Sequence, residues 1–133
     1  MIVVDTNVIA YLLLPGDRTS QARAALRQDS EWVAPLLWRS EFRNILALYL
    51  RQKHLSLDDA LQFMREAEML MQGGEYTVAS SGVLGLAASS QCSAYDCEFV
   101  ALAQELGVPL VTSDRRMLAK FPATAISLNR FGA

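Results

Sequence analysis

The order of apolar and polar positions along the chain predicts short buried strands separated by helices. Ile2–Val4 and Pro109–Thr112 are the clearest strands, because a run of apolar and β-branched residues is typical of a strand buried on both faces. Weaker strand patterns lie at 32–34, 76–78 and 125–127, and helices are expected at 6–14, 22–28, 35–52, 56–73, 83–89, 93–106 and 115–120. This alternation predicts an α/β sandwich around a parallel sheet.

Composition narrows the class of protein. A length of 133 residues suits one domain spanning 1–133, and it is long enough to bury a core. A hydrophobic fraction of 52% excludes a disordered chain. The 12 basic and 14 acidic residues give a net charge of −2, which argues against binding to nucleic acid by bulk positive charge. A few placed arginines could still contact a nucleic acid.

The chain carries few signals for its location. Cys92 and Cys97 are too few for a disulfide scaffold and lack a zinc-ligand pattern, so we expect reduced thiols in a cytoplasmic protein. No apolar run is long enough to span a membrane. Asp5 ends the first apolar run early, and no basic segment precedes that run, so no signal peptide is predicted.

Acidic residues follow the two clearest strands. Asp5 comes directly after Ile2–Val4, and Asp114 follows closely after Pro109–Thr112. In open parallel sheets, ligands bind at the carboxyl ends of the strands. We therefore expect both carboxylates at one edge of the sheet. The structural alternative is that each one only caps the helix that it precedes.

A third acid, Glu41, occupies an unusual position in the long helix at 35–52. At about 100° per residue, it shares a helix face with Leu37, Ile45 and Leu48. A carboxylate buried alone in such an apolar stripe is costly, so it needs a cation or a hydrogen-bond donor. The arginines of this helix lie on the opposite side, where they cannot easily neutralise Glu41.

A fourth acid, Asp96, shares its helix face with Val100 and Ala103, so it is expected to point toward the sheet. The structural alternative is a capping box that begins at Ser93 and has Asp96 as its acidic member. Capping does not exclude catalysis, because helix N-termini hold carboxylates in fixed orientations.

Four carboxylates that converge on one point repel one another strongly. Either some of them bind a proton, with a raised pKa, or a divalent cation neutralises them. Mg²⁺ and Mn²⁺ prefer oxygen ligands and leave positions for water and phosphate oxygens. No other site competes, because phosphate-binding glycine loops are absent and the single histidine, His54, is expected to be an ordinary exposed residue.

The segment Met1–Asn7 resembles the opening of PIN domains. The pair Ser40-Glu41, the segment Tyr95–Ala103 and the strand end Leu110–Asp114 resemble later parts of the same family, in the same order and at matching spacing. Each motif alone is weak, but the ordered set covers essentially the whole chain. The size resembles that of the VapC-type toxins of prokaryotic toxin–antitoxin pairs.

The resemblance implies a PIN-like three-layer α/β/α sandwich with a central, mostly parallel sheet, and a metal-dependent endoribonuclease. The four acids match the acidic positions of the family, so they are the candidate catalytic residues and the candidate ligands of Mg²⁺ or Mn²⁺: Asp5, Glu41, Asp96 and Asp114. Such ions lower the pKa of a water molecule and orient it for attack on an RNA phosphodiester. Supporting polar groups fall at Thr6, Asn7, Thr112 and Ser113.

Three other charged residues lie close to this set in the sequence. Arg115 and Arg116 directly follow Asp114 and are candidates for contact with substrate phosphates, with a solvated helix start as the alternative. Glu98 lies two positions after Asp96 and is either part of the acidic set or a solvated residue.

A second apolar face of the long helix predicts a protein interface. This face combines two arginines with three leucines, namely Arg39, Arg43, Leu36, Leu46 and Leu50. Mixed apolar and arginine surfaces suit such contacts, so we expect a homodimer or antitoxin interface there. The resemblance further implies RNA as substrate and an antitoxin whose peptide blocks the acidic pocket.

Two other functions are open at this point. A non-catalytic PIN-like module would bind a metal and a basic partner peptide without turnover. A phosphotransfer domain of the phosphoaspartyl phosphatase type would have a second acid two residues after Asp5. Asn7 stands at that position, which disfavours the phosphotransfer hypothesis.

Overall fold

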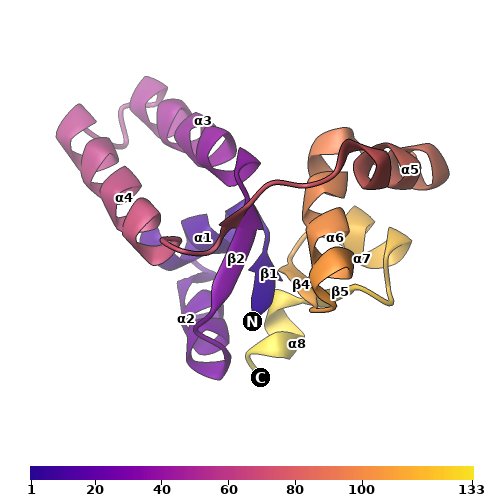
Figure 1. The fold of residues 1–133 in the computed structure, drawn as a ribbon. Helices are drawn as coiled ribbons and strands as arrows, with labels where there is room; N and C mark the ends of the chain where they lie inside the picture. The colour runs from indigo at the N-terminus through magenta and orange to yellow at the C-terminus, as the bar shows by residue number, and fades with distance from the viewer.

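The computed structural model describes residues 1–133, and its five strands form one sheet in the order β3-β2-β1-β4-β5. Each neighbouring pair of strands is parallel. The predicted parallel sheet is therefore confirmed, and it is parallel throughout (Figure 1). The strands are β1 (Ile2–Val4), β2 (Trp32–Pro35), β3 (Glu75–Tyr76), β4 (Leu110–Thr112) and β5 (Ala125–Ser127).

Helices cover the sheet and give the predicted α/β/α layers. The helix α6 packs across β1, β2 and β4, and α5 packs against α6. Right-handed crossovers place the helices that follow β1 and β2 on one face of the sheet, and those that follow β3 and β4 on the other. The helices are α1 (Thr6–Leu13), α2 (Thr19–Gln28), α3 (Leu37–Arg51), α4 (Leu57–Leu70), α5 (Ser80–Ser90), α6 (Ala94–Leu106), α7 (Arg115–Lys120) and α8 (Leu128–Phe131).

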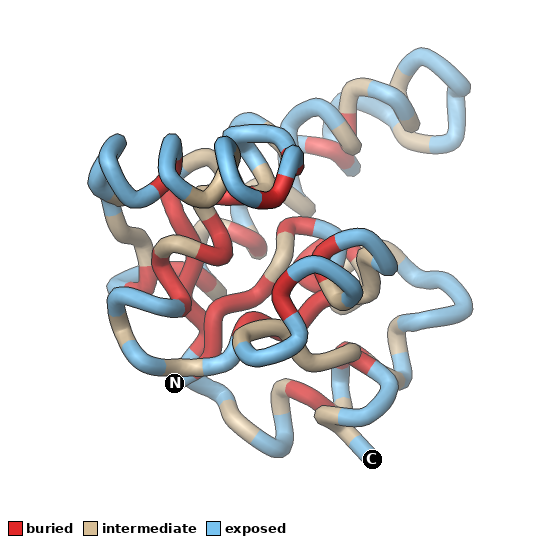
Figure 2. The backbone as a smooth tube through the Cα atoms, turned by 90° about the vertical axis from the view of Figure 1, so that its right-hand side faces the viewer, coloured by how far each residue is buried: buried red, intermediate tan, exposed pale blue.

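The core lies between the central strands and the helix faces that contact them. All three residues of β1 are buried, as the unbroken apolar run predicted. On α3 the buried residues are Trp38, Phe42 and Leu46, spaced four apart along one face. Figure 2 shows this buried backbone in the middle of the molecule, with exposed backbone around it. Removing this apolar surface from water supplies the main driving force for folding.

Several element boundaries differ from the sequence-based expectation. Pro35 was expected to open a helix, but it is the last residue of β2 and lies opposite Tyr76 of β3. The edge strand β3 is short and does not cover the predicted range 76–78. The four-residue helix α8 was not predicted, and it begins where the Ser127 hydroxyl accepts a hydrogen bond from the Arg130 amide.

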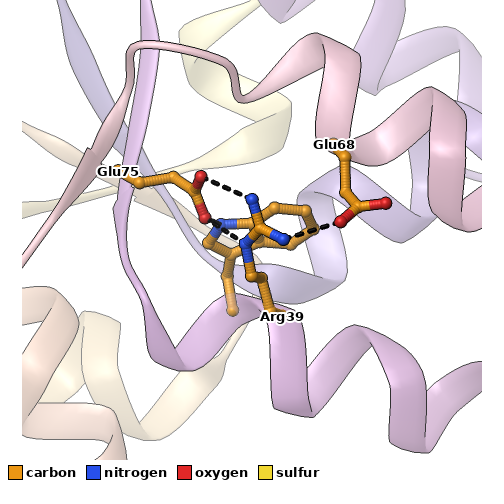
Figure 3. Close-up of polar contacts among 4 residues, drawn as sticks. Arg39, Glu68 and Glu75 are labelled. Carbon is orange, nitrogen blue, oxygen red and sulfur yellow. Dashed lines mark hydrogen bonds and ion pairs between the residues drawn. The ribbon is translucent and has the colours of Figure 1, made fainter.

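An ion-paired cluster, which we call the clasp (Arg39, Glu68 and Glu75), joins α3 to α4 and β3. Arg39 donates from Nε and Nη2 to the two carboxylate oxygens of Glu75, at 2.5 and 2.8 Å, and from Nη1 to Glu68 at 2.6 Å (Figure 3). The Trp38 indole donates a further bond to Glu75. The bidentate pairing of Arg39 with Glu75 makes these charge-assisted hydrogen bonds strong.

The clasp covers part of the face of α3 on which an interface was predicted. Arg39 is paired within the chain and Leu46 is buried in the core, whereas Leu36 stays exposed, so an interface there remains a prediction for the uncovered part. Sequence periodicity alone could not show that α4 and β3 of the same chain cover part of this face. Of the two arginines, only Arg43 is exposed to solvent.

Other expectations about isolated residues are confirmed. Cys92 and Cys97 are buried free thiols, and His54 is exposed. The longest helices are too short or too polar to cross a membrane.

Candidate active site

The chain changes direction across the sheet between β1 and β4. From β1 it proceeds to β2 and β3 on one side, and it then returns to β4 and β5 on the other. Ligands in open α/β sheets bind at such a switch point, outside the carboxyl ends of the strands. Asp5 and Asp114 follow the two strands that flank this point, and the Asp5 amide donates to the Val111 carbonyl at 3.1 Å.

All four predicted acids line one pocket at this switch point. The pocket has a volume of about 230 Å³ and a single apolar lining residue, Ile45. The expected convergence of acids from four separate segments is therefore present in the structure. The lining residues are Asp5, Thr6, Asn7, Glu41, Asn44, Ile45, Asp96 and Asp114.

A hydrogen-bonded chain fixes the two acids that follow the strands. The Thr112 hydroxyl donates to Asp5 Oδ2 at 2.8 Å and accepts from the Asp114 amide at 3.0 Å. Asp114 caps α7 by accepting from the Met117 amide, as its structural alternative predicted. The Asp5 side chain makes no capping hydrogen bond to the second or third residue of α1, so its structural alternative is not borne out.

Glu41 enters the pocket from α3. Its Oε1 accepts a 2.7 Å hydrogen bond from the Thr6 hydroxyl at the start of α1. The apolar stripe expected around Glu41 is only partly buried, since Leu48 is 44% exposed and the core face is centred on Phe42. Glu41 therefore lies at the border of the core face and not within it. The predicted direction of the Glu41 side chain is correct, but the apolar stripe from which it was predicted is only partly buried.

Asp96 enters from the first turn of α6. The Ser93 hydroxyl accepts from the Asp96 amide at 3.1 Å, which is one half of a capping box. The reciprocal bond from the Asp96 carboxylate to the Ser93 amide is absent. The carboxylate of Asp96 lines the pocket and forms no ion pair.

The predicted supporting residues divide into two groups. Thr6 and Thr112 hold acids directly, and Asn7 is an exposed residue of the pocket wall. Ser113 does not line the pocket, and its hydroxyl lies 3.1 Å from that of Tyr11. Sequence analysis missed Asn44, although its position three residues after Glu41 places it on the same helix face.

The two arginines after Asp114 are both exposed. The charge of Arg116 offsets a small part of the rise in the pKa of Asp96 that burial causes. No ion pair joins any arginine or lysine to the four acids. The pocket consequently keeps most of its negative charge uncompensated.

Burial and mutual repulsion raise the pKa of three acids of the pocket, Asp5, Glu41 and Asp96. Burial raises the pKa of Asp5, and the charges of Asp96 and Asp114 add to this effect. Burial likewise raises the pKa of Glu41, to which Asp5, Asp96 and Glu98 contribute by repulsion. Burial, followed by the charge of Asp114, raises the pKa of Asp96. A cation bound between the carboxylates would favour their ionised forms and so lower these pKa values.

The donor set fits a hard divalent cation in its chemistry. It consists of oxygen atoms, carries excess negative charge and includes the free carboxylate of Asp96. No three acidic, imidazole or thiol side chains of the structure are grouped closely enough to enclose an ion without moving. A cation would therefore have to draw the carboxylates inward, which the unpaired Asp96 side chain permits.

Comparisons with known proteins give matches over nearly the whole chain. A family model described as the PIN domain matches residues 2–123. Ribonuclease VapC3 of Pyrobaculum aerophilum is 32% identical over 125 residues, which are 92% of this chain and 95% of that protein.

Similar folds occur among solved structures. The crystal structure of PAE2754 from Pyrobaculum aerophilum superposes with a TM-score of 0.78 at 18% identity, over 98% of this chain and 85% of that one. A toxin-antitoxin complex from Klebsiella pneumoniae gives 0.71 at 16% identity, over 96% of this chain and 98% of that one. FitAcB from Neisseria gonorrhoeae gives 0.69 at 20% identity, over 96% of both chains.

Proposed function

This chain belongs to the PIN domain family, and we propose that it is a metal-dependent endoribonuclease, the toxin of a type II toxin–antitoxin pair. The observation that carries the proposal is the meeting of four carboxylates, without a pairing cation, at the switch point of the sheet. The name of the 32% identical relative supports RNA as the substrate. Residues 1–133 would act as one nuclease domain.

The four acids are the proposed ligands of Mg²⁺ or Mn²⁺, with Asp96 as the residue most free to turn toward an ion. When bound, the cation supplies an activated water and neutralises charge that develops on the phosphate. Thr112 holds Asp5 and the backbone of Asp114 in place, and Thr6 does the same for Glu41. These bonds hold the carboxylates in position before a substrate arrives.

Substrate contacts are proposed for the polar and basic groups around the pocket. Arg115 and Arg116 are exposed beside Asp114, where their guanidinium groups can pair with phosphate oxygens on either side of the cleaved bond. Asn7 and Asn44 add neutral donors at the wall. A few such groups allow RNA binding despite the net charge of −2.

The proposed partners are a cognate antitoxin and a second copy of the chain. A basic side chain of an antitoxin would satisfy the uncompensated carboxylates and exclude substrate from the same pocket. The toxin-antitoxin complex among the similar folds supports a partner of this kind. A homodimer is expected, and multi-angle light scattering of the purified protein would test it.

The function is tested by incubating purified protein with tRNA and mRNA, in Mg²⁺ or Mn²⁺ and in excess chelator. We expect cleavage only with the cation, and a loss of about a hundredfold or more in Asp96→Asn, because that variant lacks a proposed ligand. Circular dichroism should show an unchanged fold in the variant. Cleavage that survives both the chelator and the substitution contradicts the proposal, and cation binding without turnover indicates the non-catalytic module.

A further inference from the structure

A second pocket lies beside the acidic one and shares helix α6 with it. It has a volume of about 400 Å³, and most of its wall is apolar. The aromatic ring of Tyr76 contributes to one side, and α5 contributes Val83 to another. Ala94 and Glu98 enter from α6, whose Asp96 lines the acidic pocket. We call this space the α6 side pocket.

Glu98 is the only charged residue that lines the α6 side pocket. It is partly buried, and its carboxylate forms no hydrogen bond or ion pair with the rest of the protein. The hydroxyl groups of Thr77 and Ser80 are the other polar groups of the wall. An ionised carboxylate only accepts hydrogen bonds, so this pocket offers two strong acceptor atoms between apolar walls.

The position of Glu98 connects the side pocket to the proposed chemistry. Both pockets are lined by residues from α6 and by residues in or just before the first half of α3: Leu36 and Glu98 line the side pocket, and Glu41 and Asp96 line the acidic one. Asp96 and Glu98 lie two residues apart on α6, so they project to different sides of the helix, one into each pocket. The inference places the phosphate of a nucleotide at the acids and its neighbouring base in the side pocket.

The four RNA bases differ in the hydrogen-bond donors that they offer to a carboxylate. Guanine presents two adjacent donors on its Watson–Crick edge, the N1–H and the N2 amine. Adenine and cytosine place a ring nitrogen lone pair beside their amine, and uracil flanks its one N–H with two carbonyl oxygens. A carboxylate thus pairs fully with guanine and is opposed by acceptors on the other three bases.

We propose that the α6 side pocket binds a guanine base next to the cleaved phosphate, with Glu98 accepting from the N1–H and the N2 amine. The apolar walls and the Tyr76 ring cover the base, as aromatic side chains do in single-stranded RNA recognition. The inference rests on the ribonuclease function proposed above. It makes Glu98 a specificity-determining residue and not a ligand of the cation.

The test compares the wild-type protein with Glu98→Gln on single-stranded RNA of random sequence, followed by sequencing of the cut ends. We expect guanine at one fixed position relative to the cut in the wild type. In Glu98→Gln this preference should fall about tenfold or more, because an amide replaces one acceptor with a donor. Cleavage of RNA with adenine at that position should be unchanged.

A second measurement tests the individual donors with oligonucleotides that carry guanine or inosine at the preferred position. Inosine lacks the N2 amine, so kcat/KM should fall about tenfold in the wild type and much less in Glu98→Gln. The matched control is Glu105→Gln, an exposed glutamate farther along α6, which should keep the full guanine preference.

Two results separate this inference from the function on which it rests. RNA cleavage by the wild type without a guanine preference, or with a preference that Glu98→Gln retains, overturns the side-pocket assignment alone. Failure of the wild type to cut any RNA with Mg²⁺ or Mn²⁺ overturns the proposed ribonuclease function, and the guanine subsite with it.

Discussion

The molecule holds two clusters of carboxylates, and only one of them is neutralised from within. In the clasp, hydrogen bonds from Arg39 lower the pKa of Glu75. In the acidic pocket, burial raises the pKa of Asp5, Glu41 and Asp96, and no ion pair offsets it. The clasp therefore favours the folded state, whereas the acidic pocket costs stability and leaves room for an external cation.

Helix α3 contributes to both clusters within one turn. Arg39 points toward β3 and α4, and Glu41, two residues later, points toward α1. The ion pairs of Arg39 fix the start of α3. They thereby help to position Glu41, a carboxylate that no other residue neutralises. The difference shows that charge used for folding and charge kept for chemistry can lie on opposite faces of one helix.

The largest expected effect comes from adding a divalent cation. Mn²⁺ at about a hundredfold excess over its dissociation constant should raise the free energy of unfolding by about 2.7 kcal/mol, because it binds only the folded state. Urea denaturation with and without MnCl₂ measures this gain. Asp96→Asn should lose most of the gain, and Arg39→Met should keep it. An equal gain in wild type and Asp96→Asn would place the ion elsewhere.

Breaking the clasp should have the next largest effect. Arg39→Met leaves the Glu75 side chain, which is only 18% exposed, without its cation, so we expect a loss of about 2 kcal/mol in stability. The control is Arg43→Met, an exposed arginine of the same helix without an ion pair, which should change stability by less than about 0.5 kcal/mol. Equal losses in the two variants would show that the clasp adds nothing.

Removing one negative charge from the acidic pocket should have the smallest effect on stability. Unlike the loss of the clasp, it should make the protein more stable. The pKa of Asp5 is raised in the folded state, so its charge costs stability once the pH exceeds that pKa. Asp5→Asn should therefore be more stable than wild type by about 1 kcal/mol at pH 7, while losing activity.

The pH dependence checks the sign of this prediction. Below the unfolded pKa of aspartate, about 4, both states are protonated and the advantage of Asp5→Asn should vanish. The advantage grows as the pH rises from there through the folded pKa. Thermal unfolding of both proteins between pH 4 and pH 8 measures it, and an advantage that is constant with pH would rule out charge as its cause.

The site was largely predictable because its acids follow from local signals. The strands β1 and β4 are unbroken apolar runs, and an acid after each must lie at the same edge of a parallel sheet. The helical position of Asp96 gave its direction correctly. Glu41 was identified from an apolar stripe that is not the core face of α3. Periodicity shows that a helix face is apolar, but it does not show what covers that face.

The clasp was not predictable in the same way. Arg39 meets Glu75 and Glu68 across separations of 36 and 29 residues, from three different elements. The edge strand β3 is fixed by its pairing with β2, so the weak strand pattern at 76–78 indicated its neighbourhood but not its bounds. Tertiary packing decides the bounds of β3 and the partners of Arg39, and a local pattern in the sequence specifies neither.

The bond between Thr112 and Asp5 spans 107 positions of the chain. During synthesis on the ribosome, Asp5 therefore has no Thr112 hydroxyl to hold it until β4 has been made. The acidic pocket needs Asp114 as well, so it can be assembled only after both distant segments have left the ribosome. For a protein proposed to cleave RNA, the order of synthesis thus separates the making of the first acid from the assembly of the site.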